Sequence, residues 1–220
     1  MRYDRIFGLL VVFIMLGSLM GIAVNNDDNN EGEETGPTGA IIAGREPIDV
    51  NGFYFYEDTY QDSFEALIVD ELGAGTMVPF RTDPRNVSHI KIEEAAVDKI
   101  QTSEKIYLVF DPNTDDFEDT KNNIQLALAE LSRLIVIVNV NSVYPSSALT
   151  ADIPNETYDD KIPIKSCNDS TSTTAVLFFT LDGKDEVKMQ GDCTIVSGKT
   201  SESLIATADK YSMHLLGLKV

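Results

Sequence analysis

Oxygen-bearing side chains follow predicted strands at two places in this 220-residue chain, and each place could hold a ligand. The first is Asp111-Pro-Asn113-Thr-Asp115, which places oxygens at alternating positions, as the opening of an EF-hand calcium loop does. An EF-hand itself is excluded, because Asp116 stands where its sharp turn needs Gly and Asn122 where its bidentate Glu belongs. Two interpretations are left: a looser Ca²⁺ site formed by Asp111, Asn113 and Asp115, or carboxylates that cap the following helix.

The second place is Ser197-Gly-Lys199-Thr200, whose Gly-Lys-Thr stands between a predicted strand and a predicted helix, as in a phosphate-binding P-loop. The first Gly of that motif is missing, since Cys193 occupies its position, so we interpret the segment as a helix-capping turn. Ligands of parallel sheets bind beyond the carboxyl ends of the strands, so we expect any pocket where these two loops begin their helices. The candidate ligand-binding residues of the second loop are Ser197, Lys199 and Thr200.

Signatures of catalysis are scarce in this sequence. It contains no Gly-x-Ser-x-Gly elbow, no His-Glu-x-x-His pair and no Cys-x-x-Cys dithiol. Its two histidines, His89 and His214, are far apart in the sequence, so the sequence offers little support for a catalytic triad that contains histidine. We interpret both as ordinary surface or turn residues. Arg81 and Arg85 could clamp a carboxylate or an acidic glycan, but ion pairs with local carboxylates such as Asp83 are the simpler interpretation.

The only two cysteines, Cys167 and Cys193, predict one disulfide, because an even pair in an exported domain is most economically explained in that way. Free thiols and a metal site are the alternatives, although a metal would need ligands beyond two thiols and the scattered histidines. Asn86, Asn155 and Asn168 begin Asn-x-Ser/Thr sequons, which an exported domain can carry as glycosylation sites. Chance alone would give about as many sequons, so their number decides nothing.

The amino-terminal segment predicts export. Residues 6–24 form an apolar run without a charged side chain, about long enough to cross the core of a bilayer. Arg2 and Arg5 precede this run and five acidic residues follow it, so the positive-inside rule places the amino terminus in the cytoplasm and the remainder outside. A cleaved signal peptide is the alternative, and it would export the domain as well. Residues 25–39 are polar and acidic and predict a flexible stalk.

Acidic residues dominate the composition. The chain has 36 Asp and Glu against 17 Lys and Arg, a net charge of −19. Such a surface repels nucleic acid and anionic lipid, which excludes nucleic acid as a partner. Recognition of cations or of a basic partner is one interpretation of this charge, and a plain solvated surface is the other.

The pattern of apolar residues predicts an α/β fold. Two β-branched runs without alternation, residues 105–110 and 134–140, predict central strands that are covered on both faces. Residues 117–135 lie between them with apolar side chains at helical spacing, which completes a parallel βαβ unit. Further strands of this sheet are expected at residues 52–56 and 66–69.

An antiparallel hairpin is expected near the carboxyl terminus, because residues 174–181 and 186–190 are β-prone and flank the turn dipeptide Asp182-Gly183. The predicted disulfide would then join the two ends of that hairpin. The last helix is expected to place Thr207, Lys210 and His214 on a polar face. The other predicted elements are helices at 93–102 and 201–216, the latter stopped by Gly217, and a short strand at 193–196.

These observations predict one membrane anchor (1–24), a stalk (25–39) and a single extracytoplasmic α/β domain (40–220), with a mixed sheet, a parallel βαβ core and an added antiparallel hairpin. The function that we expect is a non-catalytic binding or assembly module, held at the cell membrane, for a protein or glycan partner. The alternatives are an extracytoplasmic hydrolase and a Ca²⁺-binding surface domain.

Overall fold

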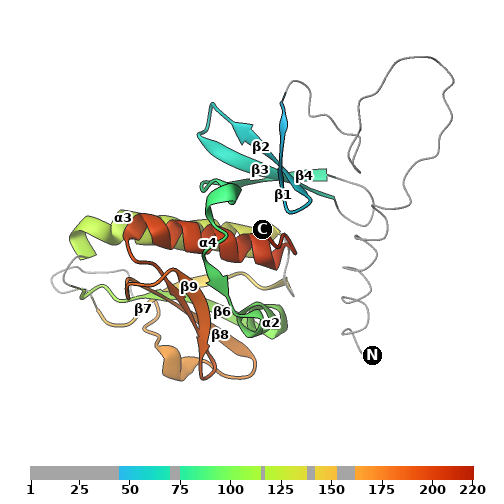
Figure 1. Cartoon of the computed structure of the whole chain (residues 1–220). Helices are drawn as coiled ribbons and strands as arrows, with labels where there is room; N and C mark the ends of the chain where they lie inside the picture. Colours follow the sequence, from blue (N-terminus) through green and yellow to red (C-terminus); the bar gives the residue numbers. More distant parts are fainter. Residues whose placement is uncertain (1–44, 70–74, 115–116, 138–141, 153–161) are drawn as a thin grey trace, which may run out of the picture.

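The computed structural model describes residues 45–69, 75–114, 117–137, 142–152 and 162–220, and it arranges their elements in three layers (Figure 1). A four-stranded antiparallel sheet lies on one side of two long helices, and a six-stranded mixed sheet lies on the other. One continuous apolar core joins the three layers. The expected α/β class with a mixed sheet is confirmed, whereas the separate antiparallel sheet was not predicted.

The mixed sheet carries the candidate site. Its strand order is β5-β9-β10-β8-β6-β7, and β7, β6, β8 and β10 run parallel to one another. The last residues of β6 and β8 therefore lie at the same edge as the last residue of β10, and we name this the carboxyl edge. The strand bounds are β5 Lys91–Ile92, β6 Lys105–Phe110, β7 Ser146–Leu149, β8 Thr174–Thr180, β9 Glu186–Gln190 and β10 Cys193–Ser197.

The antiparallel sheet turns one apolar face toward the helices. Phe55, Ala66 and Val78 lie side by side in its register, and each is almost completely buried. The strands predicted at residues 52–56 and 66–69 are confirmed, but they belong to this sheet rather than to the mixed one. The strand bounds are β1 Pro47–Val50, β2 Phe53–Asp58, β3 Ser63–Val69 and β4 Gly75–Phe80.

The helices are α2 (Glu94–Thr102), α3 (Phe117–Ile137) and α4 (Ser201–Leu215). All three were expected, but α3 continues through residues 134–137, so the strand predicted at 134–140 is wrong in its described part. Leu134 and Ile135 are buried in the last turns of α3. Val136 and Ile137 are apolar although they are exposed, so the run shows no polar face, and a short apolar run of that kind cannot be told from a strand by periodicity. The parallel partner of β6 is β7 instead.

The predicted hairpin is also wrong in its pairing. Both strands exist, but β10 lies between β8 and β9 and pairs with each of them. The antiparallel hairpin is β9–β10, whose turn is Gly191-Asp192, with Gly191 at φ 62°. Both Asp182-Gly183 and Gly191-Asp192 are turn dipeptides, and the sequence alone does not say which of them closes a tight hairpin.

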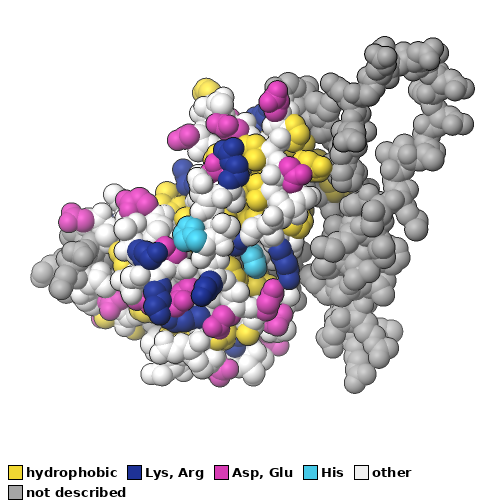
Figure 2. All heavy atoms as spheres, in the orientation of Figure 1, with side chains coloured by type: hydrophobic (Ala, Val, Ile, Leu, Met, Phe, Trp, Pro, Cys, Tyr) yellow, Lys and Arg dark blue, Asp and Glu magenta, His cyan; other side chains and the backbone are white. Residues whose placement is uncertain are grey.

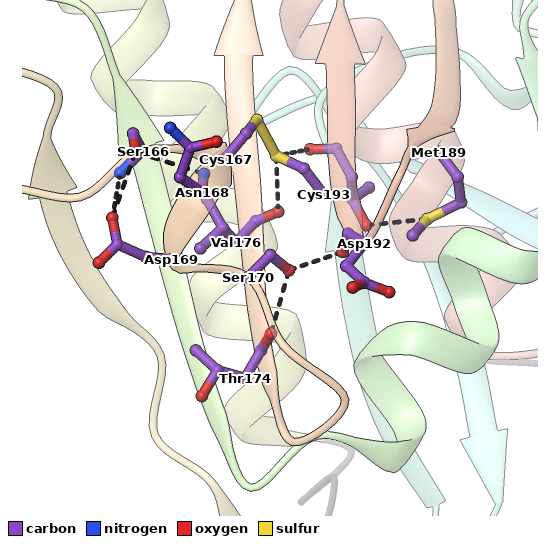
Figure 3. Close-up of a disulfide and its surroundings, with 11 residues drawn as sticks. Ser166, Cys167, Asn168, Asp169, Ser170, Thr174, Val176, Met189, Asp192 and Cys193 are labelled. Atoms are coloured by element: carbon purple, nitrogen blue, oxygen red, sulfur yellow. Dashed lines mark hydrogen bonds between the residues drawn. A yellow bond between two sulfur atoms is a disulfide. The ribbon is translucent and has the colours of Figure 1, made fainter.

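The two cysteines meet across the sheet face that the helices leave open. Their sulfur atoms are 2.09 Å apart and their Cα atoms 5.1 Å apart, which is consistent with the predicted disulfide (Figure 3). Cys167 begins the short helix η3 (Cys167–Asp169), and Cys193 is the first residue of β10. The pair therefore fastens η3 to the sheet, and the expectation that it joins two hairpin ends is wrong. Ser170 adds a second tie, since its hydroxyl donates to Asp192 O at 2.6 Å.

Helix α4 has almost no polar face. Thr207 and Lys210, which were expected to face solvent, are 0% and 3% exposed. Because α4 lies between the two sheets and beside α3, nearly every side of it is covered (Figure 1). Lys210 is accommodated because its Nζ donates to Val220 O.

The predicted anchor (1–24) and stalk (25–39) lie outside the described residues. Within the part of the chain that the structure describes, no helix is both long and apolar enough to cross a membrane.

Candidate functional site

A hollow of about 300 Å³ opens at the carboxyl edge, between the ends of β6 and β8 and the first turns of α3. We name it the edge hollow. Its volume is at the lower end of the range of small-ligand pockets. It lies where a parallel sheet is expected to bind ligands, beyond the carboxyl ends of its strands. The residues that line it are Phe110, Asp111, Thr114, Ile124 and residues 178–181.

Apolar side chains and polar atoms share the walls of the edge hollow. Phe110, Ile124 and Phe179 belong to the main core and are at most 7% exposed, so they form a fixed floor. Phe178 and Leu181 are half-buried and complete the wall. The strand β8 contributes side chains from both of its faces because the hollow lies at its end, where the alternation of faces no longer separates them.

Asp111 is the only ionisable residue that lines the edge hollow within the described part of the chain. It follows β6 directly, and its Oδ1 accepts a hydrogen bond from Asn113 N at 2.9 Å, which fixes the carboxylate in an Asx turn. No described lysine or arginine forms an ion pair with it. Thr114, which the sequence did not single out, is exposed at the rim.

The structure tests the calcium hypothesis only in part. Asn113 is exposed and Asp115 lies outside the described residues. Among the described residues, no group of three or more His, Cys, Asp or Glu side chains is arranged to hold a metal ion. A Ca²⁺ site at Asp111, Asn113 and Asp115 therefore stays a prediction.

The second predicted loop lies on the other side of β8, and its described contacts belong to the fold. Ser197 is buried, and its hydroxyl donates to Glu186 O at 3.1 Å. Thr200 caps α4, since its hydroxyl accepts from Ser203 N at 3.1 Å while the Ser203 hydroxyl accepts from Thr200 N. The interpretation as a helix-capping turn is confirmed. Ser197, Lys199 and Thr200 do not line the edge hollow, so their role in binding a ligand stays a prediction.

Asp185 holds this second loop in place. Its Oδ1 accepts a hydrogen bond from Lys199 N at 2.9 Å. Its Oδ2 forms an ion pair with Lys199 Nζ at 3.1 Å and lies 3.6 Å from His89 Nε2. Burial alone would raise the pKa of Asp185, but the donors from Lys199 and Ser203 outweigh it and lower the pKa to about 2. No feature of the sequence indicates this role, because Asp185 lies in an ordinary acidic turn.

A second acidic residue, Asp209, joins the layers. It lies in α4 with 1% exposure and accepts from Arg81 N at 3.0 Å and Thr82 N at 2.7 Å, directly after β4. Burial raises its pKa to about 6. The Arg81 side chain pairs with Glu130 of α3 at 2.8 Å, so one short segment is tied to both long helices. These contacts are structural and lie away from the edge hollow.

The other sequence candidates are dispersed. Arg85 forms an ion pair with Asp83 at 2.6 Å, as the simpler interpretation expected. Neither described histidine lines the edge hollow; His89 is exposed and His214 is half-buried, with a pKa lowered by burial. The sequon residues Asn86 and Asn168 are exposed on short helical turns, and Asn155 lies outside the described residues.

Comparisons of the chain with models of protein families, with curated proteins and with solved structures found no match. The chemistry of the edge hollow is therefore the main source of functional information on this chain.

Proposed function

We propose that this chain is a membrane-tethered, extracytoplasmic binding or assembly module that receives its partner at the edge hollow and catalyses no reaction. The observation that carries the proposal is the edge hollow itself, with its fixed apolar floor and one oriented carboxylate at the carboxyl edge. A few polar groups set among apolar walls are typical of sites that bind and orient a ligand.

The surroundings of the hollow favour binding over catalysis. Acyl transfer and hydrolysis need a nucleophile with a base at hydrogen-bonding distance. Among the described residues that line the hollow, Asp111 is the one side chain that could act as that base, and its hydrogen bond comes from Asn113 N rather than from the hydroxyl of Thr114 or Thr180. The tether is supported by the apolar run at residues 6–24 and the acidic stalk behind it.

Site-directed photo-crosslinking in the cells that make the full-length chain tests this proposal. A benzophenone side chain at Thr114, on the rim of the hollow, should form one discrete adduct. The same side chain at Asp192 should not, because that residue is exposed in the β9–β10 turn at the opposite edge of the sheet. Equal adducts from both positions, or none from Thr114, would contradict the site.

The remaining parts of the proposal have their own readouts. Protease added to intact cells should degrade the domain, and the full-length chain should sediment with membranes after a carbonate wash. Turnover of ester, glycoside or peptide substrates by the wild type, lost in Asp111→Asn, would contradict the binding module and support the alternative, an extracytoplasmic hydrolase.

A further inference from the structure

We infer that the edge hollow accepts a basic side chain of a protein partner. The apolar stem of that side chain lies against the floor and the wall of the hollow, and its cationic head lies at Asp111. This inference rests on the proposed function and adds the chemistry of the partner.

The shape of the hollow requires a ligand with an apolar body. Phe110, Ile124 and Phe179 form a floor that is almost closed to solvent, and Phe178 and Leu181 form the half-buried wall. The methylene stems of lysine and arginine bury well against such surfaces while their heads stay at the polar rim. Aromatic faces also attract a cation that comes near them.

The polar groups of the hollow select a positive head. Among the described residues that line the hollow, Asp111 carries the only carboxylate, and Asn113 N donates to its Oδ1. An ammonium or guanidinium group only donates hydrogen bonds, and a carboxylate only accepts them, so the two groups are complementary. The net charge of −19 adds a long-range attraction for a basic partner and a penalty for an acidic one.

Anions are the competing ligands, because helix amino termini attract them and both α3, which borders the hollow, and α4 start at this edge. The first turn of α3 carries Asp119, whose negative charge opposes an anion there. The start of α4 is already satisfied, since Thr200 and Ser203 cap each other's backbone and Glu202 adds a negative charge in the first turn. Two lysines of β9 and of the loop before α4 are engaged in ion pairs: Lys199 pairs with Asp185, and Lys188 pairs with Glu186. Figure 2 shows one group of basic side chains in the region of β9, with acidic side chains among them, and further basic side chains over the antiparallel sheet.

The test uses three small probes with one stem and different heads: n-butylamine, which reproduces the lysine side chain, n-butanol and butyrate. Methyl NMR of the full-length chain in detergent reports binding through Ile124 and Leu181. The amine should bind about tenfold or more tightly than the alcohol, as a hydrogen bond to a charged group predicts, and butyrate more weakly than either. Acetyl-Ala-Lys-Ala-amide should bind at least as tightly as the amine.

Asp111→Asn should abolish the preference for the amine, and its Oδ1 can still accept from Asn113 N, so the turn is retained. Asp192→Asn removes the same charge at the opposite edge and should leave the preference unchanged. Equal binding of amine and alcohol would overturn this inference while leaving the hollow as a ligand site. Binding of the amine without the peptide would overturn the protein partner. If no probe shifts Ile124 or Leu181, the inference and the proposed function both fail.

Discussion

Reduction of the Cys167–Cys193 pair should destabilise the domain by an amount that its loop length sets. The pair closes a loop with a sequence separation of 26. The chain-entropy relation for such a loop gives about 12 cal/mol/K, or about 3.5 kcal/mol near 25 °C. For a domain of this size that free energy corresponds to a fall in Tm of roughly 7–14 °C.

Calorimetry of the full-length chain with and without reductant measures this shift directly. The double variant Cys167→Ala/Cys193→Ala is the control, and its Tm should not respond to reductant. It should also lie below the Tm of the reduced wild type, because Cys193 is 1% exposed and its sulfur packs in the smaller core of that sheet face. The reasoning is refuted if mass spectrometry shows complete reduction while Tm moves by less than about 2 °C.

Three further predictions concern the contacts around α4. Gly198→Ala should destabilise the fold by about 1–3 kcal/mol in urea unfolding, because a Cβ at this position would lie 2.5 Å from Leu204 N. An unchanged midpoint of urea unfolding would contradict this and show that the turn before α4 can shift. The pKa of Asp185 is lowered from 3.8 to about 2, so its stabilisation is present above about pH 4 and is lost as pH falls through about 2. Asp185→Asn should therefore remove about 2 kcal/mol at neutral pH and flatten the acid side of the stability profile, and an unaltered acid side would contradict this. The pKa of Asp209 is raised from 3.8 to about 6. Its contribution to the free energy of unfolding is therefore full below about pH 4 and falls by up to about 3 kcal/mol as pH rises through about 6. Asp209→Asn should abolish this loss, and a variant that keeps the wild-type pH profile would refute the assignment.

The sequence predicted the positions of helices and strands better than it predicted which strands pair with one another. Strands β6, β8, β9 and β10 and all three helices lie where apolar periodicity placed them. Which strands become neighbours was not accessible, because β10 enters between β8 and β9 through tertiary packing. The end of α3 was predicted as a strand because its last residues are apolar and mostly β-branched, even where they are exposed, so no polar face marks them as helical.

The location of the candidate site could be predicted from the sequence, but the contacts of its residues could not. The rule for parallel sheets located the edge at which Asp111 lines the hollow. The contribution of Phe178 and Phe179 to the hollow was not predicted, because the pairing of β8 with β6 that brings them beside Phe110 could not be derived from the sequence. Asp185 and Asp209 were missed because their partners come from distant segments, and nothing in a sequence with 36 acidic residues distinguishes them.

The most direct test of the central claim is a methyl NMR screen of the full-length chain against a mixed fragment library of amines, alcohols, acids and sugars. If the edge hollow is the binding site, the fragments that bind will shift the Ile124 and Leu181 methyl signals and leave the buried Val187 methyl signals, outside the lining of the hollow, in place. Asp111→Asn will weaken the best of them. Fragments that consistently bind elsewhere on the domain, with Ile124 and Leu181 unmoved, would contradict the proposed site.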